Sequence, residues 1–277
     1  MGKRLTDLQK IEVVKEYTVN KKNATEIARK YGVSSTSISS ILEVRGIPKR
    51  IHRKYEFNEN YFDVIDTEDK AYFLGVLYAD GCNSEERGAV ILVLQDKDKC
   101  LIDSFRKALN LKKKAFLVDR SKDKDSNKRR NQYRLEICSR HISERLAKLG
   151  CFKAKSLTLK FPTEEQVPKH LLGHFLRGVW DGDGNFLKYE NKTIKVTNYK
   201  ACLGSSIYFC NQLKEFMINN FSINCYLYQP PSKDQLFCEL SINGKNQCKK
   251  FMDWIYKDCN FYLKRKYLNY KKIFKEK

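Results

Sequence analysis

A short stretch that occurs twice decides the fold of this chain. Residues 72–81 read YFLGVLYADG and residues 175–184 read FLRGVWDGDG, so each copy is an apolar run that ends in an acid and a glycine. The two acids, Asp80 and Asp183, are 183 − 80 = 103 positions apart. A repeat at this distance in a chain of 277 residues predicts two similar halves.

Small residues within each copy predict how the two copies meet. Gly75 and Ala79 lie four positions apart, and so do Gly178 and Gly182. Residues four apart share one face of a helix, and small residues on that face allow two helix backbones to approach closely. We therefore predict two helices that pack against each other through these four residues.

The acids would lie at the C-terminal ends of these helices. Gly81 and Gly184 follow them and suit a left-handed residue at a helix end. Negative charge is disfavoured at this end of a helix. Helices that pack side by side would place both carboxylates together, and neighbouring carboxylates favour a divalent cation such as Mg²⁺.

Both stretches resemble the LAGLIDADG motif of homing endonucleases. The matching residues are Gly75, Ala79, Asp80 and Gly81 in the first copy, and Gly178, Asp181, Gly182, Asp183 and Gly184 in the second. Tyr78 departs from the motif, because the family usually has an acid there. The alternative is two buried helices whose Asp-Gly ends arose by chance, and it requires that coincidence twice.

The resemblance covers about residues 68–270 and implies an α+β fold. Two pseudo-symmetric αββαββα repeats, residues 68–160 and 161–277, would form a β-saddle that binds DNA. The resemblance also implies a monomer that cuts both strands across the minor groove and leaves short 3′ overhangs.

The resemblance further implies which residues form the catalytic site. Asp80 and Asp183 would bind the metal, assisted by the backbone carbonyls of Ala79 and Gly182. The family places a basic residue near each centre, and Lys155 and Lys266 follow the last helix of their repeats. Arg265 competes with Lys266 for this role, and ordinary surface lysines are the alternative for both positions.

Alternating polar residues predict the DNA-facing side of the saddle. Between residues 131 and 138, apolar and polar side chains alternate, which is typical of a strand with one buried face. Paired strands fit the DNA major groove, where base pairs are distinguishable. The alternative is a polar face that is only solvated. The predicted contact residues are Arg120, Arg134, Lys188, Lys195, Thr197, Gln229 and Gln235.

The first 47 residues predict a separate all-α domain. Three short helical patterns, with a glycine turn before the last, resemble a helix-turn-helix. Ser35, Thr36 and Ser39 at the start of the third helix would contact DNA, and residues 48–67 would form a basic linker. The alternative is a three-helix module that binds protein.

Net charge indicates a polyanionic partner. The formal charge is +21, and the basic residues are concentrated in residues 1–54, 112–134 and 245–277. We therefore expect a long, asymmetric double-stranded DNA target as the partner, with intron RNA as a further candidate.

Cysteine usage bears on compartment and metal type. The ten cysteines form no CxxC pair and there are four histidines, which argues against zinc. Most of the cysteines lie in apolar runs, so we expect reduced thiols inside a cell, in the cytoplasm or an organelle matrix. No apolar run is long enough to predict a membrane span.

The sequence thus predicts a site-specific, Mg²⁺-dependent double-strand DNA endonuclease of the intron-homing type, encoded by a mobile intron or a free-standing gene. Two other functions fit the same fold. One is a maturase that binds intron RNA, and the other is a DNA-binding regulator without catalytic activity. The presence of both acids opposes the regulator.

Overall fold

The computed structural model describes residues 5–48, 55–120, 130–191 and 195–274. It divides the chain into two compact units, residues 1–54 and residues 55–277. Residues 49–54, the basic part of the predicted linker, lie outside the described residues. In the part of the chain that is described, no helix is long and apolar enough to cross a membrane.

The N-terminal unit contains three short helices. They are α1 (Asp7–Thr18), α2 (Ala24–Tyr31) and α3 (Ser35–Val44). The side chains of Thr6, Asn23 and Ser34 each accept a backbone N–H from the first turn of the helix that follows, which stabilises its start. Gly32 ends α2 with φ +66°, a conformation that favours glycine. The helices enclose their own small core of Val13, Tyr17, Ile27, Ile38 and Leu42.

The second unit contains two repeats with the same order of elements. The first repeat comprises α4 (Glu68–Asp80), β1 (Gly81–Ser84), β2 (Ala89–Gln95), α5 (Lys99–Ala108), β3 (Phe116–Val118), β4 (Gln132–Cys138) and α6 (Arg140–Lys148). The second comprises α7 (Leu172–Asp183), β5 (Gly184–Asn191), β6 (Val196–Ser206), α8 (Ile207–Phe221), β7 (Cys225–Tyr228), β8 (Phe237–Asn243), α9 (Lys245–Ile255) and the additional α10 (Lys264–Phe274). The predicted α+β class with two αββαββα repeats is confirmed.

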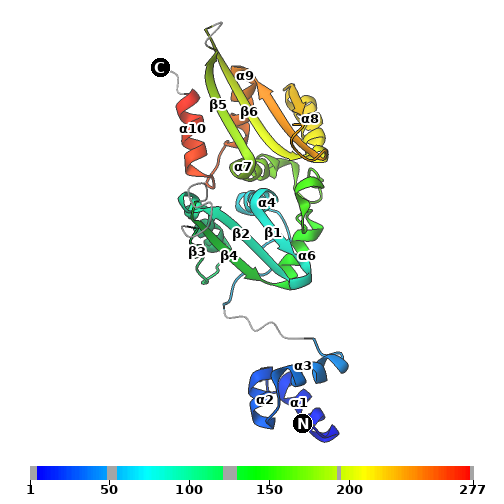
Figure 1. Cartoon of the computed structure of the whole chain (residues 1–277). Coiled ribbons are helices and arrows are strands. Elements are labelled where there is room, and N and C mark those ends of the chain that lie inside the picture. The colour runs from blue at the N-terminus through cyan, green and yellow to red at the C-terminus, as the bar shows by residue number, and fades with distance from the viewer. Residues whose placement is uncertain (1–4, 49–54, 121–129, 192–194, 275–277) are drawn as a thin grey trace. The chain divides into compact units, whose positions relative to one another are not determined.

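Each repeat forms one four-stranded antiparallel sheet, ordered β1-β2-β4-β3 in the first and β5-β6-β8-β7 in the second. Helices α5 and α6 pack on one face of the first sheet, and α8 and α9 on the corresponding face of the second (Figure 1). The helix-covered face is apolar and buries Val90, Leu92 and Leu135 in the first sheet. The other face of the second sheet is open and exposes Tyr189 and Tyr226.

Helices α4 and α7 lie side by side between the two sheets (Figure 1). Glycine is needed where they cross. A Cβ on Gly75 would lie 2.0 Å from the carbonyl oxygen of Phe175, and a Cβ on Gly178 would lie 2.0 Å from that of Tyr72. The two helix backbones are therefore in direct contact, and this contact joins the two repeats into one core.

Residues 55–67 differ from the prediction that they belong to a linker. They are part of the second unit, and Tyr61 and Phe62 are buried in its core with 3% and 0% of their surface exposed. The Tyr61 hydroxyl also donates a hydrogen bond to the Asp69 carboxylate in α4. The first repeat therefore starts to pack before α4 begins.

The glycines after the two acids also differ from the prediction. Gly81 and Gly184 have φ values of −79° and −80°, so they are extended and begin strands instead of adopting a left-handed turn. Space explains the glycines, because a Cβ on Gly81 would lie 2.6 Å from the Leu77 carbonyl oxygen. A Cβ on Gly184 would lie 2.4 Å from the ring of Trp180.

Candidate active site

The packing of α4 against α7 brings two acids to one end of the helix pair. Asp80 is the last residue of α4 and Asp183 is the last residue of α7. Gly182 leaves room for the first carboxylate, because a Cβ there would lie 2.9 Å from Asp80 Oδ2 and 2.2 Å from the Ala79 Cβ. Both acid side chains reach solvent on one side. Within the described residues, neither has a hydrogen-bond or ion-pair partner.

The surroundings of the two acids disfavour their charged forms. Most of the volume around Asp80 is protein, and this burial raises its pKa to about 6, with a further increase from the charge of Asp183. Burial also raises the pKa of Asp183. Lys266 and Lys155 oppose both shifts, since a nearby positive charge stabilises a carboxylate.

Two crowded carboxylates that have no partner among the described residues fit a hard divalent cation. Mg²⁺ is commonly held by one or two protein carboxylates, with water and substrate phosphates completing its coordination. The described residues contain no cluster of three or more His, Cys, Asp or Glu side chains that could hold a metal by themselves. The donor set at this end of the helix pair therefore fits a metal that is completed by water and a phosphate.

Two lysines, one from each repeat, lie close enough to the acids for their charges to act on both carboxylates. Lys155 is buried, and its Nζ donates a hydrogen bond to the carbonyl oxygen of Gly81. Lys266 Nζ donates to the carbonyl of Gly184 at 2.6 Å, and also to those of Trp180 and Gly182 at 2.8 and 3.1 Å. Burial lowers the pKa of Lys266 to about 8. The Gly182 carbonyl, a predicted metal ligand, thus already accepts a hydrogen bond.

A polar pocket of about 200 Å³ opens beside Asp80. Its polar lining includes Gln95 at the end of β2, Gln132 at the start of β4, Asp98, and Arg265 at the start of α10. Sequence reasoning identified Arg265 but missed the other three. No motif marks them, because the pocket joins segments that are far apart in the chain.

Position 78 of the first repeat and position 181 of the second have structural roles. Asp181 is buried, and its carboxylate accepts hydrogen bonds from the hydroxyls of Tyr72 at 2.8 Å and Tyr256 at 2.9 Å and from the Leu263 N–H at 2.6 Å. The Tyr78 hydroxyl donates to a backbone carbonyl in the core. The departure of Tyr78 from the motif therefore leaves the two acids at the helix ends unchanged.

The predicted contact residues of the first sheet lie on or beside its open face. Arg134 is next to the buried Leu135 in β4, so its side chain lies on the opposite, open face of the sheet. Its guanidinium lies 3.5 Å from the Glu136 carboxylate. Arg120 follows β3 and donates to Gln132 Oε1 at 3.2 Å. Arg120 and Arg134 therefore lie on or beside the face that the helices leave uncovered.

In the second sheet, two of the predicted contact residues are on the wrong face. Lys188 lies in register with Phe186 on the helix-covered side, with its Nζ 5.7 Å from the Tyr199 ring centroid. Thr197 has the same orientation as Tyr199. The alternation was misread because the β5–β6 hairpin extends past the core, where the sequence loses its apolar period.

The remaining predicted contact residues lie at turns or in the N-terminal unit. Lys195 is exposed with φ +50°, and the Gln229 side chain donates to the Gln235 carbonyl at 2.6 Å. In the N-terminal unit, the predicted DNA contacts fall in the first turns of α3, where two are exposed and one is half-buried. They are Ser35, Thr36 and Ser39.

These features define an α+β protein of two αββαββα repeats that join through paired helices with an acid at the end of each. This architecture resembles the two-repeat LAGLIDADG fold, and the stretches at residues 72–81 and 175–184 form its helix pair.

Comparison with known proteins gives distant similarities. No family model matches the chain. The tRNA-splicing ligase RtcB of Methanopyrus kandleri is 23% identical over 198 residues, which cover 66% of this chain and 20% of that protein. The chain thus spans about a fifth of the length of that ligase.

Several solved structures are also similar. The I-LtrWI LAGLIDADG homing endonuclease bound to target DNA has 12% identity and a TM-score of 0.48, with 78% of this chain and 90% of that chain covered. I-GzeII in complex with its DNA target has 11% identity and a TM-score of 0.47, with 73% and 87% covered. The N-terminal LAGLIDADG domain of DUF199/WhiA has 13% identity and a TM-score of 0.43, with 72% and 89% covered.

Proposed function

We propose that this protein is a site-specific DNA endonuclease that cuts both strands of a duplex in the presence of a divalent cation. The observation that carries the proposal is the meeting of Asp80 and Asp183, which come from different repeats and have no partner among the described residues. A regulator that only binds DNA has no need for two crowded carboxylates at the end of its helix pair.

The surroundings of the acids support the same function. The acids end the helices from which β1 and β5 begin, so each lies next to an open sheet face that can receive a duplex. The net charge of +21 supplies the attraction to phosphates. A duplex on both sheets would place its backbone over the acids, with the two strands served by the two repeats.

Hydrolysis joins a water oxygen to phosphorus, breaks the bond from phosphorus to the 3′ oxygen, and protonates that oxygen. Asp80 and Asp183 would hold the divalent cation, which supplies charge stabilisation and an activated water when bound. Lys155 and Lys266 would add positive charge beneath the reacting phosphates. Their hydrogen bonds to the carbonyls of Gly81 and Gly184 fix the first residues of β1 and β5 at the site.

The N-terminal unit would add contacts at one end of the target. Its α3 presents small hydroxyl side chains on an exposed surface, and a tethered second module raises affinity through its effective concentration. The target would therefore be long and asymmetric, and a single chain with two repeats would suffice as a monomer.

A library of randomised DNA duplexes tests the proposal without knowledge of the target. The protein is incubated with the library and Mg²⁺, and cleaved molecules are captured and sequenced. We expect one dominant sequence, cut in both strands, and no products in excess EDTA. Enrichment of bound but uncut duplexes would instead indicate a regulator, and preferential binding of structured RNA would favour a maturase.

A further inference from the structure

The register of the two sheets shows which positions are equivalent in the two repeats. In the first sheet, the glycine after the motif acid pairs with Leu92, and Leu92 pairs with Leu135. In the second sheet, the equivalent glycine pairs with Leu203, and Leu203 pairs with Leu240. Residues at the same sequence offset from these leucines therefore occupy equivalent positions in the two repeats.

Around Asp80 the matched positions are polar. Gln95 and Asp98 lie three and six residues after the first leucine, and Gln132 lies three residues before the second. Together with Arg265 they line the pocket of about 200 Å³. The pocket is therefore built from both repeats, because its arginine comes from the start of α10.

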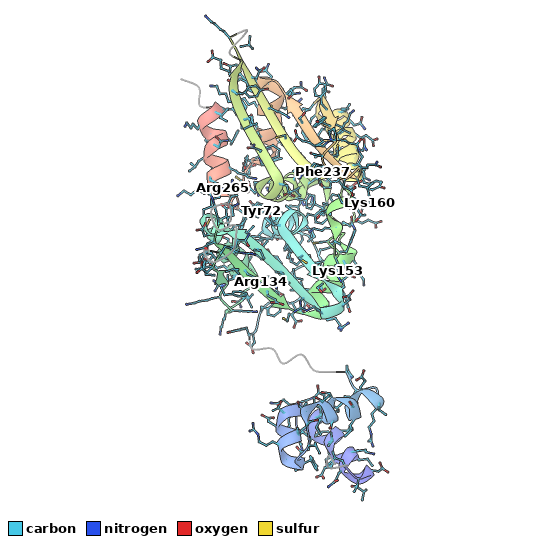
Figure 2. All side chains as sticks on the ribbon, viewed as in Figure 1. Tyr72, Arg134, Lys153, Lys160, Phe237 and Arg265 are labelled. Carbon is cyan, nitrogen blue, oxygen red and sulfur yellow. The ribbon has the colours of Figure 1, made fainter. Side chains whose placement is uncertain are left out.

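Around Asp183 the equivalent positions are small or apolar. The position of Gln95 holds Ser206, whose hydroxyl donates to the Leu159 carbonyl and accepts the Phe209 N–H at the start of α8. The three other positions hold residues without a charge or an amide side chain. Phe209 and Phe237 follow from the same counting, and Ala154 is the residue before Lys155, as Arg265 is the residue before Lys266. Figure 2 shows Arg265 and Phe237 on opposite sides of the helix pair that contains Tyr72.

Arg265 is held in a fixed orientation in the pocket beside Asp80. Its Nε and Nη2 donate to the two carboxylate oxygens of Asp98, both at 2.9 Å. Asp98 is only 6% exposed, whereas the Arg265 side chain is 44% exposed. Nη1 has no hydrogen-bond partner among the described residues. The guanidinium is therefore anchored on one edge and can still donate to a ligand.

We infer that Arg265, positioned by Asp98, binds the phosphate at the Asp80 centre only, so that the two DNA strands are cut in a fixed order. This inference rests on the proposed endonuclease function. The strand at the Asp80 centre would be cut first, and a nicked duplex would be the intermediate. The Asp183 centre would cut more slowly, since among the described residues only Lys266 and Lys155 act on that carboxylate with a positive charge.

The role of Arg265 in the step is electrostatic. As the water oxygen bonds to phosphorus and the bond to the 3′ oxygen breaks, negative charge grows on the phosphate oxygens. A guanidinium that is already oriented stabilises this charge without reorganisation. It gives up no proton, because arginine stays protonated in proteins. Loss of one such donor typically lowers a rate by on the order of 10²–10³.

A strand-resolved cleavage assay tests the inference. The probe is the duplex recovered from the randomised library, labelled at one strand end in one sample and at the other strand end in a second. The wild-type protein should give nicked duplex before linear product. Arg265→Ala should slow the strand that is normally cut first by on the order of 10², should leave the rate of the other strand nearly unchanged, and should therefore reverse the order.

Three further variants distinguish positioning from folding. Asp98→Asn should slow the same strand, because the amide can accept only one of the two hydrogen bonds. Arg265→Lys should restore part of the rate, since it keeps the charge but loses the fixed orientation. Arg106→Ala breaks another Arg–Asp pair, with Asp103 at 3.0 Å, and should change neither strand. Thermal unfolding of each variant accompanies the assay.

Each outcome decides the question. Slowing of one strand by both Arg265→Ala and Asp98→Asn supports the inference. Equal slowing of both strands would show that the Asp98–Arg265 pair only stabilises the fold, and unchanged rates would show that it is not used; either result overturns the inference while the endonuclease function stands. A wild-type protein that cuts neither strand of any library duplex would overturn both.

Discussion

Gly75 and Gly178 lie opposite each other where α4 crosses α7, and each leaves room for a backbone carbonyl of the other helix. The distance from an added Cβ to that carbonyl would be 2.0 Å at both positions. This symmetric contact sets the separation of the helices and therefore the separation of the two acids at their ends. Stability and activity should depend on it together.

Replacing Gly178 with alanine should destabilise the second unit. The added methyl cannot fit beside the Tyr72 carbonyl, so the helices must move apart, and overpacking of this kind typically costs about 1–3 kcal/mol. Chemical denaturation should show a lower free energy of unfolding. Glu215→Ala, at an exposed position of α8, is the control and should change it little. Equal stability of the two variants would contradict the close helix contact.

Asp181 should matter for stability, in contrast to its neighbour Asp183. Its buried carboxylate has three donors, and an asparagine there would leave at least one of them without an acceptor. Unsatisfied buried groups cost about 1–3 kcal/mol, so Asp181→Asn should lower the free energy of unfolding by that amount. Asp66→Asn, at an exposed site, is the matched control. A stable Asp181→Asn protein would show that the buried network is dispensable.

Cleavage at limiting Mg²⁺ should weaken as the pH falls below about 6. The pKa of Asp80 is raised to about 6 by burial and by Asp183, and a carboxylate must lose its proton to bind metal. Below this pH, protons compete with the metal, so the Mg²⁺ concentration that gives half-maximal cleavage should increase about tenfold per pH unit. Titrations at pH 7.5, 6.0 and 5.0 check this. An unchanged half-maximal concentration would exclude Asp80 as a ligand.

Deleting residues 1–54 should leave a folded nuclease with weaker DNA binding. The N-terminal unit has its own core, and both candidate metal ligands lie in the other unit. The loss of a tethered module lowers affinity without a change in chemistry. DNase footprinting should show a footprint shortened at one end, and cleavage at saturating protein should persist. A full-length footprint would mean that this unit does not contact DNA.

The helix pair was predictable because its determinants are local. Two small residues four positions apart, followed by an acid, appear twice in the sequence, and the same spacing produces the contact at Gly75 and Gly178. The first strand was not predicted. Its sequence, Gly81 to Ser84, has little strand propensity, and its conformation depends on pairing with β2.

The pocket beside Asp80 was not predictable from local patterns. Gln95, Asp98 and Arg265 meet only because the sheet register and the docking of α10 bring them together, and Asp98 and Arg265 are 167 residues apart. The predicted orientation of Lys188 was wrong for a related reason. Strand period alone does not show which face is covered once a hairpin extends beyond the core.

The most direct test of the central claim compares Asp80→Asn and Asp183→Asn with the wild-type protein on the selected duplex in Mg²⁺. Either substitution should abolish double-strand cleavage, because it removes a charge needed to hold the metal. DNA affinity should stay within a few-fold of wild type, since the sheets and basic surfaces are unchanged. Full double-strand cleavage by either variant would contradict the assignment of these two acids as the catalytic centre.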